Sequence, residues 1–146
     1  MNAKSAKNDP SSRALERLRA AGIRATRQRL ALAALLFDGT CKHLSAEQIH
    51  KSVNKNNIKV SLATVYNCLH QFADLALIKE VTAGKDHTYF DTNIENHYHF
   101  YDEDTRALTD IPLAAIELKK LPKPPGHQKI TGIDIIIRTK ALNRMG

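Results

Sequence analysis

The chain has 146 residues, of which 42% are hydrophobic and 25% charged, as in ordinary globular proteins of one domain or two small ones. No apolar run approaches the roughly 18 residues of a membrane-spanning helix, and Cys41 and Cys68 form no Cys-x-x-Cys pair. We therefore expect a cytoplasmic protein with reduced thiols, no membrane partner and no disulfide framework. Residues 1–80 carry 13 Lys and Arg against 6 Asp and Glu (13 − 6 = +7), whereas residues 81–146 carry 9 of each. This asymmetry favours a first half that binds a polyanion.

The first half of the chain predicts helices followed by a hairpin. Residues 1–10 lack the apolar core of a secretory signal, and we interpret them as a short disordered tail. Ser11 or Ser12 is expected to cap the first helix, and Thr26 precedes the second. Ser45, followed by Gln48, has the spacing of a capping box for the third helix.

Ser61 is expected to cap a fourth helix, which two short β-prone segments follow over residues 77–92, joined by a turn that contains Gly84. Helices followed by a hairpin predict a winged-helix DNA-binding domain over residues 11–92.

The second half, residues 93–146, predicts a small α/β domain for dimerisation and metal sensing, so the whole chain is expected to be α+β. The segments HYHFYDED and TRALTD are expected to pair as strands. PLAAIELKKL predicts a helix with Pro112 near its first position, and ITGIDIIIRT predicts a strand with a buried centre. A segment this small is expected to be stabilised by a second copy of the chain, in a dimer or a tetramer.

A constellation of histidines and aspartates suggests a metal site. His97 and His99 are two residues apart, and such residues project from the same face of a strand. His43, Asp91 and Asp110 are candidates to join them where the helical half meets the β half. Three His and two Asp without a thiolate suit five- or six-coordinate Fe²⁺ or Mn²⁺, with Zn²⁺ as a competitor. The alternative is a pair of half-exposed strand histidines without a ligand.

Several motifs carry a family resemblance over residues 12–138. GIRATRQRLAL, HLSAEQIH, VSLATVYNCLHQFADLALIKEV, YFDT and His-x-His occur in the order seen in the ferric uptake regulator family of bacterial metal-sensing transcription factors, which the chain resembles. The resemblance implies that the regulatory metal ligands are His43, Asp91, His97, His99 and Asp110.

Within that family the sequence departs from the common pattern. Cysteine pairs that hold a structural zinc in most members are missing, which excludes a Cys₄ zinc site. The chain looks most like the iron response regulator of the α-proteobacteria, which is tied to haem and iron, and second most like the peroxide-responsive branch. Glu117 and Asp134 match positions of a further metal site, but Asn96 and Tyr98 stand where its other ligands would be. We expect that second site to be incomplete.

The resemblance also implies that residues 61–71 form a DNA-recognition helix. Tyr66 is expected to contact a thymine methyl group, and Ser61 and Thr64 to contact phosphates. Asn67 favours adenine, which predicts A·T-rich operators on double-stranded DNA. Arg24 matches a family residue that enters the narrow minor groove.

Three other functions are compared with this interpretation of the sequence. An iron oxygenase would need a His/Asp triad with open coordination, but five ligands would nearly saturate the ion, so we expect no enzyme and no catalytic residues. A peroxide-sensing repressor would oxidise its own His ligands with Fe²⁺. A haem sensor would use His97 or His99 as an axial ligand.

Overall fold

The computed structural model describes residues 9–55 and 57–143. The chain separates into two compact units, unit 1 ending at Ile94 and unit 2 beginning at Glu95, and each is described by itself. Most of the tail expected at residues 1–10 lies outside the described residues. No described helix has both the length and the apolar character needed to cross a bilayer.

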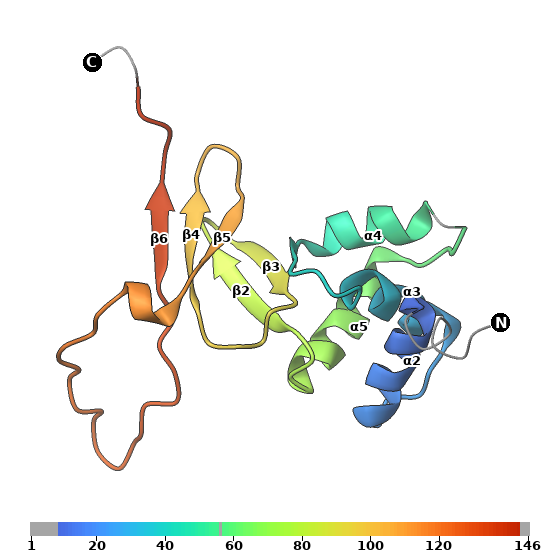
Figure 1. Cartoon of the computed structure of the whole chain (residues 1–146), viewed down its shortest axis with the longest axis horizontal. Helices are drawn as coiled ribbons and strands as arrows, with labels where there is room; N and C mark the ends of the chain where they lie inside the picture. The colour runs from blue at the N-terminus through green and yellow to red at the C-terminus, as the bar shows by residue number, and fades with distance from the viewer. Residues whose placement is uncertain (1–8, 56, 144–146) are drawn as a thin grey trace. The chain divides into compact units, whose positions relative to one another are not determined.

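The described part of unit 1 contains four helices, which Figure 1 labels. Their bounds are α2 (Pro10–Ala20), α3 (Arg27–Leu36), α4 (Ala46–Asn54) and α5 (Leu62–Asp74). The prediction that Ser11 or Ser12 caps α2 is wrong, because the helix begins earlier and both serines lie within its first turn. Asp9 is its N-cap and Pro10 its first residue, a position where the fixed φ of proline already suits a helix and no N–H is needed.

The predicted caps Ser45 and Ser61 are confirmed, and Thr26, expected only to precede α3, is its N-cap. Thr26 Oγ1 accepts a hydrogen bond from the backbone N–H of Arg29 at 3.2 Å. Ser45 and Gln48 form a reciprocal capping box, with bonds of 3.2 and 2.9 Å. Ser61 Oγ accepts from the N–H of Thr64 at 3.1 Å. These caps satisfy amides that a helix start otherwise leaves unpaired.

The core of unit 1 lies between these helices and the strand that follows them. Its largest fully buried side chains are Leu18, Leu32, Leu36, Ile49, Leu69, Phe72, Ile78 and Phe90. Within α5, Val65, Leu69 and Phe72 are buried at helical spacing and form one stripe. The burial of this stripe fixes which face of α5 points inward and leaves the other face for function.

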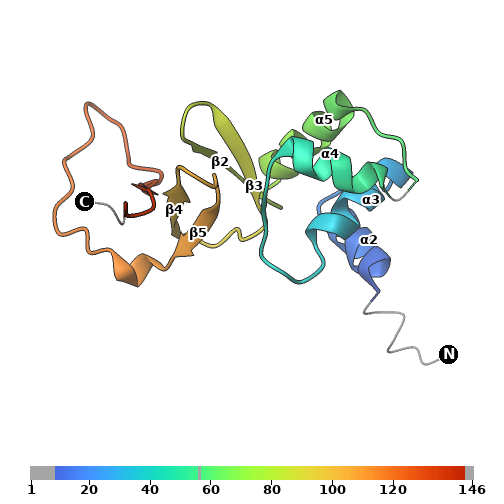
Figure 2. The same ribbon diagram turned by 90° about the horizontal axis from the view of Figure 1, so that it is seen from above.

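A three-stranded antiparallel sheet completes unit 1. It contains β1 (His43–Leu44), β2 (Lys79–Ala83) and β3 (His87–Asp91) in the order β1-β3-β2. The β2–β3 hairpin confirms the predicted wing, and Figure 2 shows it as a twisted ribbon. In the register of β1 with β3, His43 lies opposite Asp91.

Unit 2 is a second three-stranded sheet. Its strands are β4 (Tyr98–Asp102), β5 (Leu108–Ile111) and β6 (Ile136–Thr139), in the order β5-β4-β6. Strands β4 and β5 pair, as predicted; the pairing is antiparallel and sets His99 opposite Asp110. Strand β6 runs parallel to β4 on its other side.

Two predictions for unit 2 are wrong. Residues 112–121 are not a helix: only a short 3₁₀ turn, η1 (Leu113–Ala115), forms, and Ile116 is already extended. Such a short helix needs a packed face for stability, yet Leu118 and Leu121 are exposed. The β-branched segment forms a strand only over β6, and Ile137 within it is 39% exposed rather than buried.

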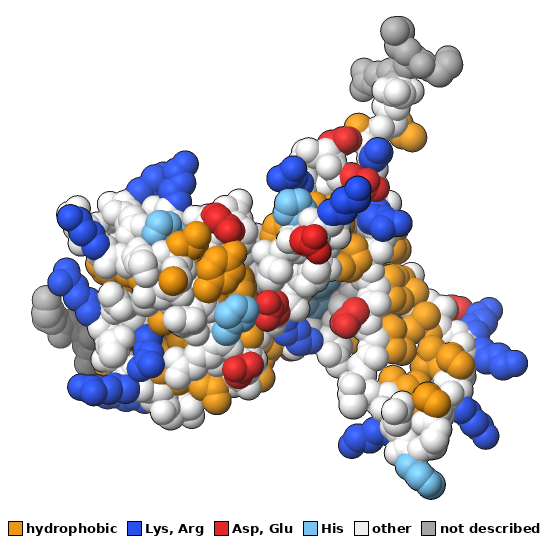
Figure 3. All heavy atoms as spheres, turned by 180° about the vertical axis from the view of Figure 1, so that it is seen from behind, with side chains coloured by type: hydrophobic (Ala, Val, Ile, Leu, Met, Phe, Trp, Pro, Cys, Tyr) orange, Lys and Arg blue, Asp and Glu red, His pale blue; other side chains and the backbone are white. Residues whose placement is uncertain are grey.

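These two differences share a physical cause. Unit 2 carries a concentration of exposed apolar side chains, because no described element covers the Phe100 face of its sheet. Except for Leu75 and Ile94, all exposed large hydrophobics of the described chain belong to unit 2: Phe100, Leu113, Leu118, Leu121, Ile130, Ile133, Ile137 and Leu142. Figure 3 shows hydrophobic side chains gathered on the long connection before β6, with Lys and Arg at its margins.

Candidate metal centre and DNA-reading helix

The first His/Asp pair lies in unit 1, where β1 meets β3. His43 Nε2 is 3.2 Å from Asp91 Oδ2, and the Asp91 side chain is fully buried. Asp91 Oδ1 also accepts a hydrogen bond from the N–H of Asn93 at 2.9 Å. Burying a carboxylate is costly unless it is paired and hydrogen-bonded, so these contacts explain how Asp91 is held at the end of its strand.

The loop before β1 positions His43. Lys42 is hydrogen-bonded along its backbone to Thr92, with its N–H donating to Thr92 Oγ1 at 2.9 Å and its carbonyl accepting from the Thr92 N–H at 3.1 Å. Its ammonium donates to Asp38 Oδ2 and to the carbonyl of Leu35, both at 2.6 Å. The Lys42 ammonium, with smaller contributions from Thr40, holds the pKa of Asp38 well below its usual range. The loop is thereby fastened both to α3 and to the segment that follows Asp91.

The second His/Asp set lies in unit 2. His97 Nε2 and His99 Nε2 are 3.1 and 3.5 Å from the same oxygen, Asp110 Oδ1. The two imidazole centroids are 4.4 Å apart, with the ring planes at 64°. Both histidine side chains are buried, at 6% and 8% exposure, whereas Asp110 is about one-third exposed. The set therefore points three donor groups at one small region.

A hydrogen bond fixes the orientation of His97. Its Nδ1 lies within hydrogen-bond distance of the backbone carbonyl of Glu95. Because a carbonyl only accepts, Nδ1 is the donor in this contact, and Nε2 is the ring nitrogen that faces Asp110. Metal-binding histidines in proteins commonly make this kind of outer contact.

Both sets are made of groups that can hold a metal ion. Imidazole nitrogen and carboxylate oxygen without thiolate suit Fe²⁺, Mn²⁺ and Zn²⁺. Other predicted ligands are not gathered in this way. Glu117 is 80% exposed, with its carboxylate 3.8 Å from Lys119, and Asp134 is exposed on the long connection before β6.

The predicted DNA-reading residues occupy the start and the outer face of α5. Ser61 and Asn67 are exposed, while Thr64 and Tyr66 are half-buried. Ser61 Oγ donates to Thr64 Oγ1 at 2.9 Å, in addition to its capping role. Arg24 is exposed in the turn before α3, and its carbonyl accepts a bond from Arg29 Nη1 at 3.0 Å.

Arg29 therefore has a structural role beside any contact with phosphate. Besides holding the Arg24 turn, it approaches the Cys68 thiol inside α5. Burial raises the pKa of Cys68, and the neighbouring Arg29 guanidinium opposes this in part. Cys68 is only 8% exposed, which argues for a packing role.

Reasoning from sequence missed Glu47 and His70, which both contact Tyr66 at this face. Tyr66 donates its hydroxyl to Glu47 Oε1 of α4 at 2.9 Å, and its ring stacks on His70 with centroids 6.0 Å apart. The four-residue spacing of Tyr66 and His70 was the available signal for that stack. Nothing in the sequence connects Glu47 with Tyr66.

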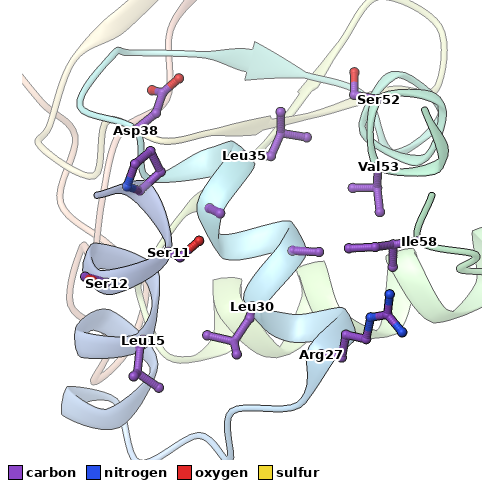
Figure 4. A pocket seen from close by; sticks show the side chains of 13 residues that line it. Ser11, Ser12, Leu15, Arg27, Leu30, Leu35, Asp38, Ser52, Val53 and Ile58 are labelled. Atoms are coloured by element: carbon purple, nitrogen blue, oxygen red, sulfur yellow. The ribbon is translucent and has the colours of Figure 1, made fainter. Parts of the chain in front are cut away.

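A cavity of about 700 Å³ opens over α3 between α2 and α4 (Figure 4). Leu15, Leu30, Leu35, Val53 and Ile58 make its lining mainly apolar. Among the described residues that line it there is no histidine or cysteine, and its charged members are Arg27 and Asp38. It lacks the convergent titratable groups expected of a catalytic site.

Comparison with known proteins identifies the family. Residues 20–131 match the Ferric uptake regulator family. The peroxide-responsive repressor PerR of Staphylococcus aureus (strain Mu50) is 34% identical over 119 residues, which cover 81% of this chain and 76% of the repressor. The chain belongs to the ferric uptake regulator family. Members of this family are metal-responsive transcription regulators that bind DNA and act as dimers, and they are not enzymes.

Solved structures of ferric uptake regulators share the fold. That of Vibrio cholerae superposes with a TM-score of 0.66 at 22% identity, over 86% of this chain and 98% of that one. The Pseudomonas aeruginosa regulator, whose structure is described as containing manganese, gives 0.68 at 23%, over 89% and 98%. These likenesses confirm the predicted α+β fold. Assignment to the iron response regulator branch stays a prediction.

Proposed function

We propose that this chain is a cytoplasmic, metal-dependent transcription regulator of iron and haem homeostasis. In this proposal one Fe²⁺ or Mn²⁺ ion is held by His43 and Asp91 of unit 1 together with His97, His99 and Asp110 of unit 2. The observation that carries the proposal is the pair of preformed His/Asp sets, one in each unit, at the ends of a short connection.

Ligand number favours one shared ion over two separate ones. Unit 1 supplies two side-chain donors and unit 2 supplies three, whereas Fe²⁺ and Mn²⁺ prefer five or six ligands. Asp91 and His97 are six positions apart, and a fully extended chain of that length spans at most about 20 Å. The connection therefore keeps the second set at high effective concentration for an ion bound by the first.

A shared ion would act as a clasp. It binds best to the relative orientation of the units in which both sets reach it, and so raises the population of that orientation. In a dimer, that orientation sets the separation of the two α5 helices and hence their fit to successive major grooves. Metal and DNA then strengthen each other's binding by the same factor.

The unit 2 surface supports a homodimer as the working form. Phe100 of β4 and Ile137 of β6 are register neighbours on one sheet face, and both are about 40% exposed. A contiguous apolar face of this kind is typical of an interface between copies. A second copy would also supply the packing surface that residues 112–121 need to become helical.

DNA reading is assigned to five residues. Arg24 enters a narrow A·T-tract minor groove, Ser61 and Thr64 contact phosphates, and Tyr66 and Asn67 contact bases of an A·T-rich inverted repeat. The exposure of Arg24, Ser61 and Asn67 supports this assignment.

The test is the affinity of the full-length chain for a labelled A·T-rich inverted repeat, with Mn²⁺ and after chelation. We expect His43→Ala and His99→Ala each to abolish the metal-dependent gain in affinity, although they lie in different units. His127→Ala, at an exposed position on the connection before β6, is the matched control. Metal-dependent binding that survives loss of either histidine would refute the clasp.

A peroxide-sensing repressor is the second candidate, favoured by the similarity to PerR of Staphylococcus aureus. With Fe²⁺ bound, hydrogen peroxide would transfer one oxygen atom to the ring carbon of His97 or His99 and release water. Mass spectrometry would detect an adduct of about 16 Da on a histidine peptide, with concurrent release from DNA. A haem sensor is the third candidate, and it predicts a Soret band that His97→Ala or His99→Ala removes.

A further inference from the structure

The hydroxyl of Tyr66 is engaged by the protein at the face expected to read DNA. Its oxygen lies 2.9 Å from Glu47 Oε1, a contact between residues 19 positions apart. The Glu47 carboxylate raises the pKa of Tyr66. The pKa of Glu47 is lowered, first by its own backbone N–H and then by the Tyr66 hydroxyl. Both directions correspond to a neutral phenol that donates to an ionised carboxylate.

Glu47 is itself firmly placed. It lies in the first turn of α4, between Ser45 and Gln48 of the capping box. A carboxylate there is stabilised by the positive end of the helix dipole. Behind it, Ile49 of α4 and Val65 of α5 are fully buried in the same core. The acceptor for Tyr66 is therefore fixed relative to α5 by the packing of unit 1.

The ring of Tyr66 is also held along α5. His70 stacks on it, with planes at 24°, and meets Phe90 edge-on at a centroid distance of 6.0 Å. His70 Nδ1 is 3.6 Å from Glu80 Oε2 on β2. Residues from α4, α5 and the β2–β3 hairpin thus set the pose of one aromatic side chain beside the exposed Ala63 and Asn67.

We propose that Glu47 is a positioning residue that makes the Tyr66 contact selective for the 5-methyl group of thymine. This inference rests on the proposed function, in which α5 enters the major groove. A free phenol hydroxyl both donates and accepts hydrogen bonds, so it could pair with polar edges of several bases. When its hydroxyl donates a hydrogen bond to Glu47, the ring edge remains as an apolar surface, and thymine alone presents a methyl group in that groove.

The carboxylate adds a second source of selectivity. Purine N7, guanine O6 and thymine O4 are all acceptors, and an ionised Glu47 close to them would be repelled. The amino groups of cytosine and adenine would be attracted to a carboxylate only if the phenol did not already occupy it. The Glu47–Tyr66 bond therefore disfavours polar readout at this position and leaves methyl contact as the favoured interaction.

The experiment measures methyl discrimination rather than affinity alone. The full-length chain with Mn²⁺ is titrated with an A·T-rich inverted repeat in which thymines are replaced by deoxyuridine, one symmetric pair at a time. We expect one pair to weaken wild-type binding by about fourfold per half-site, the worth of one buried methyl group.

Glu47→Ala should reduce this thymine-to-uridine ratio toward one. Glu47→Gln should keep most of it, because the amide oxygen still accepts from Tyr66. In a Tyr66→Phe background, Glu47→Ala should have no further effect on the ratio. Glu16→Gln removes an exposed acid of α2 and reports the general effect of charge on affinity.

Two results would overturn the inference in different ways. A wild-type chain that binds the repeat but shows equal affinity for every uridine duplex would refute the methyl contact. Retention of full discrimination by Glu47→Ala, with circular dichroism confirming an intact fold, would refute the role of Glu47. Absence of metal-dependent binding to any duplex would instead refute the proposed function itself.

Discussion

Asp38→Ala tests how the loop that carries His43 is held. Asp38 lies just after the end of α3, and its carboxylate accepts three hydrogen bonds. The backbone N–H and hydroxyl of Thr40 donate to Oδ1 at 3.0 and 2.6 Å, and the Lys42 ammonium donates to Oδ2 at 2.6 Å. The substitution removes all three bonds without creating a buried cavity, since the carboxylate is about one-third exposed.

The expected loss of stability follows from these contacts. A net hydrogen bond contributes about 0.5–1.5 kcal/mol, and the lower end applies to the exposed Thr40 bonds. An exposed ion pair contributes about 0–1 kcal/mol. The free energy of unfolding should therefore fall by about 1–2 kcal/mol at pH 7. The Mn²⁺ affinity should also fall, by about threefold to tenfold, because the ion would have to order a looser loop around His43.

The pH dependence gives this prediction a second readout. The Lys42 ammonium and Thr40 depress the pKa of Asp38 in the folded chain. A depressed acid pKa contributes stability that is fully present above the unfolded value, near 4, and is lost as the pH falls through the folded value. The difference between wild type and Asp38→Ala should thus be constant from pH 8 to pH 5 and shrink below about pH 4.

Urea unfolding followed by circular dichroism at several pH values measures both effects. Asp74→Ala removes an exposed acid from the end of α5 in the same unit and should change stability by less than about 0.5 kcal/mol. A loss below about 0.5 kcal/mol for Asp38→Ala at pH 7 would refute the reasoning. So would a loss that is equally large at pH 3.5, since the ionised carboxylate would then not be its source.

Two further predictions follow from burial and exposure. Cys41 is exposed, whereas Cys68 is buried and its thiol pKa is raised. Ellman's reagent should therefore modify Cys41 at once and Cys68 only after urea unfolding. Equal rates of modification in the native chain would contradict the packing of α5. Phe100→Glu should convert the dimer to monomer in sedimentation experiments while the helical signal of unit 1 is retained. Phe37→Glu, in the core of unit 1, should instead unfold the chain. A Phe100→Glu variant that still dimerises would show that the β4 face is not part of the interface.

Features with local causes could be predicted from the sequence. Helix caps at Thr26, Ser45 and Ser61 depend on a side chain and an amide three residues away. The convergence of His99 and Asp110 was predictable as well, because antiparallel pairing of two adjacent strands sets the register. In each case the partner lies close in sequence or is fixed by strand periodicity.

Features that depend on packing between distant elements could not be predicted. The Glu47–Tyr66 bond requires the crossing of α4 and α5 to be known in detail. Residues 112–121 have good helical periodicity, but helicity in so short a segment depends on a surface to cover. The described residues of unit 2 offer no such surface to this segment, since its Leu118 and Leu121 are exposed.

The local chemistry of the two His/Asp sets also bears on what kind of metal site they form. The buried Asp91 carboxylate has His43 and the Asn93 amide as partners, and Asp110 has two imidazoles. Each acid thus has polar partners within its own unit, so we expect neither unit to need an ion to hold its acid in place. A structural zinc site differs, since its ligands hold the fold together only through the metal. Chelation should therefore abolish tight DNA binding while leaving the circular dichroism spectrum unchanged, which is the behaviour required of a reversible effector.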